Sequence, residues 1–234
     1  MSNSNFIDIL LFGVLPYIAL AMFIIVAILR YRLQRFSYSS LSSQFLENRM
    51  HFWSVVPFHY GLLVVLLGHF VAFLIPRQIL IWNSHPMRLF ILEITTLIFG
   101  MLALIGIVGA MFRRISNAKV AIVTSPADWV LNILLFIQII GGIGIAVFMS
   151  WGSSWFASSA SPYLWSLVKF NPEIPYISSM PLFVKLHIVN AFVIILFFPF
   201  TRLVHILVTP LHYFARKMQV VRWNYDRGAI RNVE

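Results

Sequence analysis

The chain has 234 residues, of which 60% are hydrophobic and only 10% are charged. A soluble domain of this length usually carries about a quarter charged residues, so the composition excludes an ordinary soluble protein. The formal charge of +10 does not indicate a nucleic-acid partner, because the basic residues lie between apolar segments, and the absence of cysteine excludes disulfides, thiolate-bound iron–sulfur clusters and covalent CxxCH haem attachment.

Five apolar segments are long enough to cross a bilayer, which takes about 20 residues of helix. The chain is therefore predicted to be an all-α integral membrane bundle of five transmembrane helices, forming one domain over residues 1–234. The first segment lacks the basic region of a cleaved signal peptide, so we read it as a retained span. The predicted spans are 6–29, 52–75, 89–112, 129–149 and 182–208.

Basic residues are unequally divided between the two sides of this bundle. Thirteen of the 17 Lys and Arg residues fall on one side, which by the positive-inside rule is the cytoplasm. The amino terminus is then periplasmic and the carboxyl terminus cytoplasmic, as expected of a multi-pass protein of the cell inner membrane in contact with membrane lipid. The external stretch 150–181 either caps a site on the periplasmic side or lies loose in solvent.

Two of the predicted spans carry two histidines each. His59 and His69 are about 15 Å apart along the second span, and His187 and His205 about 27 Å apart along the fifth, if both are helical. Eighteen residues make five full turns, so His187 and His205 would share one face. Ionisable side chains inside a membrane are costly and usually functional.

Chain direction determines which histidines lie at the same depth. His59 pairs with His205 on the cytoplasmic side and His69 with His187 on the periplasmic side, which predicts axial ligands for the irons of two haem b groups. Pro199, helix tilt or a displaced terminal ligand must absorb the unequal spacings, and Pro199 is expected to kink the fifth span. The alternative is that these histidines bond backbone carbonyl groups or line a polar cavity.

Other residues near the histidines suit a haem site or ordinary packing. Arg202, Arg113 and Arg114 would bind haem propionates, since arginine pairs well with carboxylates; alternatively they anchor the chain at the membrane surface. Of the three, Arg202, one turn before His205, is the favoured propionate ligand. Gly61 and Gly68 would leave room for a porphyrin face, or would serve helix packing.

Several motifs in order make the chain resemble the gamma (cytochrome b, dihaem membrane) subunit of membrane-bound respiratory nitrate reductase. The resemblance covers nearly the whole chain. It includes LPYIA at 15–19, LRY at 29–31, SSQFLE at 42–47, FHYGLL at 58–63, GHF at 68–70, TSPAD at 124–128, FIQ at 136–138, KLH at 185–187, FPFTRLVHI at 198–206 and ARKMQVVR at 215–222.

The resemblance implies a function and partners. The family's four axial ligands fall on His59, His69, His187 and His205. It implies oxidation of a membrane quinol near the outer haem, with protons released to the periplasm. Electrons would pass through both haems to an iron–sulfur subunit on the cytoplasmic face, and then to a molybdenum subunit that reduces nitrate.

One feature of the family's quinol site differs here. The family's lysine near the outer end of the third span is replaced by an uncharged residue near Leu89, with Arg88 and His85 close by. The expected quinol site is formed by Gly68, His69, Arg88, His85 and Glu93. Glu93 would carry quinol protons or pair with a basic neighbour, and the alternative for Arg88 is an interfacial anchor.

Two other functions are compatible with these features. A related membrane cytochrome b of a sulfur-metabolising complex would share the five spans and the histidines. A haem-free membrane anchor or small transporter would use the histidines to line a polar path. Absorption bands of reduced b-type haem distinguish the last class from the other two.

Overall fold

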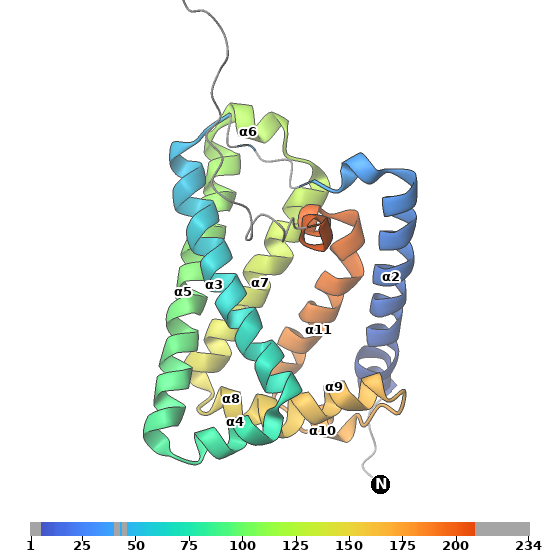
Figure 1. Cartoon of the computed structure of the whole chain (residues 1–234), viewed down its shortest axis with the longest axis vertical. Helices are drawn as coiled ribbons and strands as arrows, with labels where there is room; N and C mark the ends of the chain where they lie inside the picture. Colours follow the sequence, from blue (N-terminus) through green and yellow to red (C-terminus); the bar gives the residue numbers. More distant parts are fainter. Residues whose placement is uncertain (1–5, 40–42, 44–45, 209–234) are drawn as a thin grey trace, which may run out of the picture.

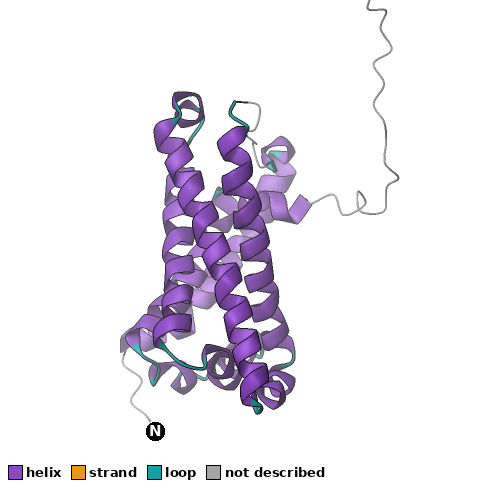
Figure 2. Ribbon diagram, turned by 90° about the vertical axis from the view of Figure 1, so that its left-hand side faces the viewer, coloured by secondary structure: helices purple, strands orange, loops and turns teal. Residues whose placement is uncertain are grey.

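The computed structural model describes residues 6–39, 43 and 46–208, and this part of the chain is helical without strands (Figure 2). Five helices are long and apolar enough to cross a membrane. They confirm the predicted all-α bundle of five spans. Their bounds are Phe6–Leu33, in which α1 (Phe6–Asp8) and the π-helix η1 (Ile9–Val14) lead into α2 (Leu15–Leu33); α3 (Arg49–Leu74); α5 (Pro86–Ser116); α7 (Pro126–Phe148); and Leu182–Phe200, which contains α11 (Leu182–Phe197) and η4 (Phe198–Phe200).

Short helices cover both ends of the bundle (Figure 1). We call the lower end in that view the α4 end; its elements are α4 (Pro76–Asn83), α8 (Gly152–Trp155), the π-helix η3 (Phe156–Ala160), α9 (Ser161–Val168) and α10 (Pro175–Ser178). We call the opposite end the α6 end; its elements are η2 (Arg35–Ser37), α6 (Ala118–Ile122) and the 3-10 segment η5 (Arg202–Val208).

Local sequence explains where several helices begin. Pro76, Pro86 and Pro126 each lie in the first turn of a helix. Proline is tolerated there because backbone N–H groups in the first turn have no hydrogen-bond partner within the helix. Ser125 and Asp128 form a capping box at α7: the Ser125 hydroxyl accepts from the Asp128 amide, and the Asp128 carboxylate accepts from the Ser125 amide.

The long helices are packed in the order α3, α5, α7, α11, α2, and among the described residues α3 does not pack along α11 or α2 (Figure 1). Small residues bring α3 and α5 together. A Cβ on Gly61 would lie 2.9 Å from the Ala103 Cα atom, and one on Gly106 would lie 2.6 Å from the Phe58 Cα atom. The two backbones therefore touch, and α5 holds α3 in place.

The fifth span ends earlier than predicted. Its α-helix stops at Phe197, Thr201 is extended, and His205 lies on the separate segment η5. The physical reason is Pro199, which has no N–H for the helix and is fully buried. The Arg30 guanidinium in α2 donates to the carbonyl oxygens of Pro199 (2.6 Å) and Thr201 (3.1 Å). The helical span is therefore shorter than the predicted 182–208, and the kink expected at Pro199 is a break in the helix. Five full turns of a single helix thus do not place His187 and His205 on one face.

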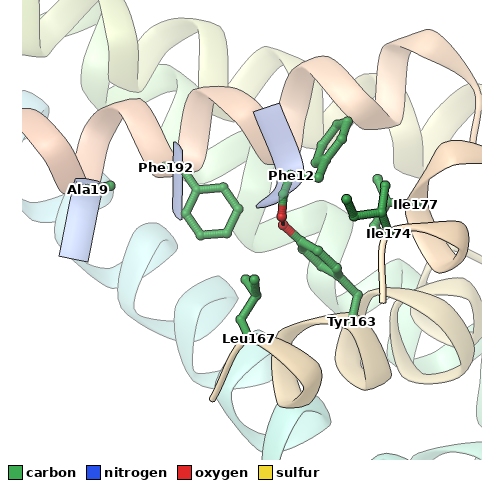
Figure 3. Packing of buried hydrophobic residues seen from close by; sticks show 7 residues of the cluster. All are labelled: Phe12, Ala19, Tyr163, Leu167, Ile174, Ile177 and Phe192. Carbon is green, nitrogen blue, oxygen red and sulfur yellow. Dashed lines mark hydrogen bonds between the residues drawn. The ribbon is translucent and has the colours of Figure 1, made fainter. Parts of the chain in front are cut away.

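The stretch 150–181 is packed onto the α4 end instead of lying loose. Its helices share a core with the first and fifth spans, in which the Tyr163 hydroxyl donates to the Phe12 carbonyl at 2.7 Å (Figure 3). The buried residues of this core are Phe12, Ala19, Tyr163, Leu167, Ile174, Ile177 and Phe192. Lys185 and Asp8 add an ion pair between the fifth and first spans, with 3.1 Å between Nζ and Oδ2.

Candidate functional site

The two histidines of α3 have the same local environment. The ring Nδ1 of His59 lies 2.8 Å from the Val55 carbonyl, and that of His69 lies 2.8 Å from the Val65 carbonyl. A carbonyl oxygen only accepts hydrogen bonds, so Nδ1 carries the proton in the neutral ring and Nε2 keeps its lone pair. This is the tautomer of an imidazole that binds a metal through Nε2. Both side chains are exposed on a membrane span, where an imidazole without a ligand is costly.

His205 faces His59 across the bundle. Its Nδ1 lies 2.6 Å from the Arg202 carbonyl, which selects the same tautomer as in His59. The centres of the two imidazole rings are 6.5 Å apart, with 64° between the ring planes. Imidazole nitrogens bind metals at about 2 Å, so two imidazoles that share one metal have ring centres roughly 6 Å apart. The separation of His59 and His205 therefore fits a haem iron with two axial histidines.

His187 has a different environment. Its Nε2 lies 3.1 Å from the side-chain nitrogen of Gln138. The oxygen of the same Gln138 amide accepts a hydrogen bond from the Asn190 side chain at 2.7 Å. The amide nitrogen donates, so Nε2 of His187 is an acceptor and its buried Nδ1 has no hydrogen-bond partner among the described residues. The ring lies against α7, where a Cβ on Gly141 would be 3.0 Å from Nδ1. To bind a metal through Nε2, His187 must release Gln138.

The structure nevertheless places His187 within electrostatic range of His69.

The surroundings of the predicted glycines differ. A Cβ added to Gly68 would have no described atom within 4 Å, whereas Gly61 is used for the contact with α5. Only Gly68 leaves space beside a histidine, so the suggestion that Gly61 makes room for a porphyrin is replaced by a packing role.

Two of the three predicted propionate ligands are already paired with protein groups. Arg113, of which 4% is exposed, donates through all three nitrogens to Glu47 and Ser43, with Nε 2.6 Å from the Glu47 carboxylate. Arg202 forms an ion pair with Asp128, with 2.7 Å between Nε and Oδ1. These arginines hold the chain together at the α6 end, and their role as propionate ligands stays a prediction.

Arg114 is the remaining cation of this group. Its buried Nε has no hydrogen-bond partner among the described residues. The guanidinium interacts electrostatically with Asp128, Arg202 and Arg113, so two positive charges and one negative charge surround it. A partly buried arginine with donors to spare can pair with an added carboxylate.

The residues expected at the quinol site are only partly brought together. Arg88 lies over the Trp82 ring, 5.5 Å from its centre, and His85 precedes α5 at the exposed surface. Glu93 is not paired with a basic residue within the part described: one carboxylate oxygen accepts from the amide and the hydroxyl of Ser153, at 3.0 and 2.8 Å.

One contact at the α4 end could not be predicted from the sequence. The Phe156 ring meets the His69 ring edge to face, with centres 5.1 Å apart. Phe156 lies in the stretch 150–181, which contains many aromatic residues, and no local pattern distinguishes it. Across residues 6–39, 43 and 46–208, no three His, Asp or Glu side chains gather in a way that would hold a free metal ion.

Known proteins resemble the chain over nearly its whole length. The family model described as "Nitrate reductase gamma subunit" matches residues 8–224. The nitrate reductase gamma chain of Bacillus subtilis is 33% identical over 218 residues, covering 91% of this chain and 97% of that protein. The respiratory nitrate reductase 2 gamma chain of Escherichia coli is 32% identical over 225 residues, covering 93% and 98%.

The chain also matches one part of a longer protein. The nitrate reductase-like protein NarX of Mycobacterium tuberculosis is 26% identical over 221 residues, which cover 91% of this chain but 33% of NarX. The family model extends from residue 8, in the first membrane-spanning helix, over the other four such helices and all four histidines. The chain is therefore a multi-pass membrane protein that belongs to the nitrate reductase gamma subunit family.

Proposed function

We propose that this chain is the dihaem, quinol-oxidising membrane subunit of a respiratory nitrate reductase complex. The observation that carries the proposal is the pair His59 and His205, whose ring centres lie 6.5 Å apart on two elements far apart in the sequence, α3 and η5. Membership of the gamma subunit family favours this function over a sulfur-metabolising complex or a haem-free transporter.

The charge distribution sets the direction of the bundle in this proposal. The basic residues Arg30, Arg113, Arg114 and Arg202 belong to the α6 end, which is therefore the cytoplasmic end. An iron–sulfur subunit and a molybdenum-containing catalytic subunit would bind there. The α4 end is then periplasmic, and a membrane quinol would be oxidised near it.

Each histidine has a defined role in holding the cofactors. His59 and His205 would bind the haem iron at the cytoplasmic end, and the carbonyl groups of Val55 and Arg202 orient their rings. His69 and His187 would bind the second haem iron, once His187 has turned away from Gln138. When bound, two haem b groups supply the one-electron carriers between the quinol and the partner subunits.

Two further groups have roles in this proposal. Arg114 is the arginine that would bind a propionate at the cytoplasmic end, because Arg113 and Arg202 are taken by Glu47 and Asp128. At the periplasmic end, Gly68 leaves space beside His69 for a quinol head group. His85 and Arg88 lie at the exposed surface of the same end.

A ligand scan of the purified complex tests the proposal. His59→Ala and His205→Ala are expected to remove one and the same b-type haem, and His69→Ala and His187→Ala the other. His51→Ala, on the same helix as His59, serves as the control and retains both. The proposal fails if the intact wild-type protein lacks reduced b-type absorption bands, or if His59→Ala and His187→Ala remove the same haem.

A further inference from the structure

His69 is held from two sides, and one of them is external to the bundle. The Val65 carbonyl fixes Nδ1 at 2.8 Å, and the Phe156 ring stands at 82° to the imidazole plane with 5.1 Å between ring centres. Edge-to-face contacts of this kind favour one relative orientation of two rings. Rotation of the imidazole would break both contacts, so Phe156 limits the orientation of His69.

The segment that follows Phe156 is attached to the helix that carries His69. The Ser161 hydroxyl and the Trp165 indole both donate to the Phe73 carbonyl, at 3.2 and 2.9 Å. Trp165 also stacks on the Phe73 ring, with centres 4.9 Å apart. Phe73 lies one turn beyond His69, where the last carbonyl groups of a helix have no partner within it. The external segment supplies that partner and is fixed relative to His69.

The segment that precedes Phe156 is attached to two other helices. Glu93 of α5 accepts from the Ser153 amide and hydroxyl, and the buried Asn83 side chain of α4 donates to the hydroxyls of Ser153 and Ser154, both at 3.0 Å. Trp151 has a φ of 72°, which a bulky residue adopts only where its surroundings hold it. Ser153 comes less than one helical turn before Phe156, so these bonds set the position of the phenyl ring.

We propose that residues 152–160, comprising α8 and η3, form a cap that positions the His69 imidazole through Phe156, with Glu93 and Asn83 as its tethers. This inference rests on the proposed function, in which His69 binds the haem iron at the α4 end. Glu93 then acts as a hydrogen-bond acceptor for the cap, and its charge is not needed for quinol oxidation. The π-helical geometry of η3 agrees with a functional position, since single π turns are frequent at such sites.

The first experiment measures the redox potential and the low-spin haem signals of the purified complex. Phe156→Ala is expected to shift the potential and the signal of the haem bound by His69 and to lower quinol oxidation roughly tenfold, as loss of a ligand's supporting group does. Phe156→Leu should give a smaller shift, and Phe148→Ala, which removes an exposed phenyl group at the end of α7, should give none. Wild-type potentials for both haems in Phe156→Ala would overturn the proposal.

The second experiment separates the tether from a proton acceptor. Glu93→Gln keeps an oxygen that accepts from Ser153 and should retain the wild-type rate and haem signals. Glu93→Leu removes the acceptor and should reproduce the shift of Phe156→Ala. Slow quinol oxidation by Glu93→Gln with unchanged haem signals would assign Glu93 to proton transfer and would overturn its role as a tether.

A third measurement does not depend on haem. The chain has no cysteine, so Ala157→Cys introduces a single thiol beside Phe156, at a position that is 2% exposed. A maleimide should label it slowly in the otherwise wild-type complex and roughly tenfold faster after Glu93→Leu or Asn83→Leu, because the cap opens more often. Equal labelling rates would refute the cap, whereas absent haem with intact protection would refute only the proposed function.

Discussion

Arg202 and Asp128 are joined at two points: Nε lies 2.7 Å from Oδ1, and Nη2 lies 2.7 Å from Oδ2. The same Nη2 donates to the Val123 carbonyl at 2.9 Å, while the Arg202 carbonyl holds the His205 ring. Arg202 thus connects the start of α7 with the segment that carries His205. Its side chain fixes the segment, and its backbone orients the imidazole.

Breaking this ion pair is expected to loosen His205. Asp128→Asn keeps an acceptor for the Ser125 amide but leaves the Arg202 charge unpaired in a mostly buried position, which costs about 3 kcal/mol. The variant should unfold at a lower temperature and lose the haem proposed for the α6 end first. Ser125→Ala removes the hydrogen bond that caps the start of α7 but leaves the ion pair between Arg202 and Asp128 intact, and should cost about 1 kcal/mol. Equal losses in the two variants would contradict the role given to the pair.

The contact between α3 and α5 should not tolerate one added methyl group. In Gly106→Ala the new Cβ would lie 2.6 Å from the Phe58 Cα atom, so α3 must move next to His59. Overpacking of this kind costs about 1–3 kcal/mol. Gly100→Ala on the same helix is the control, since its Cβ would meet the Ile143 side chain at an ordinary 3.4 Å. Thermal unfolding in detergent should separate the two variants, and equal stability would argue against close backbone packing.

Removal of the Arg30 side chain should destabilise the end of the fifth span. Its guanidinium donates to the carbonyl groups of Pro199, Thr201 and Ser37, and each carbonyl left without a donor costs about 1–3 kcal/mol. Arg30→Met is therefore expected to lower the unfolding temperature and the retention of the haem that we propose His205 binds. Arg32→Met, in the same turn of α2 and exposed, should behave like the wild type. A matching loss in both would attribute the effect to membrane anchoring.

The ion pair between Glu47 and Arg113 should make stability depend on pH. Burial by itself raises the pKa of Glu47, but hydrogen bonds from the Met50 amide and Arg113, with the charge of Arg113, hold the pKa below its ordinary value of 4.5. A carboxyl group whose pKa is lower in the folded state stabilises the fold above its ordinary pKa. That stability is lost as the pH falls through the lowered value.

Glu47→Gln is expected to remove this part of the acid sensitivity. Denaturation measured from neutral pH down to about pH 3 should give a shallower loss of stability than in the wild type. Glu173→Gln, at an exposed position of the stretch 150–181, is the control and should keep the wild-type profile. An unchanged profile in Glu47→Gln would show that the pair does not contribute to acid sensitivity.

The five spans and the depth of the α3 histidines were predictable because both depend on local properties. A run of about 20 apolar residues is helical in a membrane whatever its neighbours are. Within such a helix, the rise per residue sets the distance between His59 and His69. The same rule failed for His187 and His205, because Pro199 ends the helix between them and η5 follows a different path.

The roles of the charged residues were not predictable from local properties. Arg113 pairs with Glu47 across 66 residues, Arg202 with Asp128 across 74, and Arg30 donates to Pro199 across 169. A sequence pattern names the cation but not its partner, so anchors, propionate ligands and internal ion pairs look alike.

By itself, the amino-acid sequence determined the class of the protein, the number of its spans and the positions of the histidines along them, because length, hydropathy and helical rise act within a segment. The pairing of His59 with His205 followed from chain direction, but only the tertiary structure decided that their ring centres lie 6.5 Å apart, that His187 bonds Gln138, and that Phe156 reaches His69. These relations arise from contacts between segments far apart in the chain, where backbone packing at Gly61 and Gly106 and the break at Pro199 determine which side chains meet.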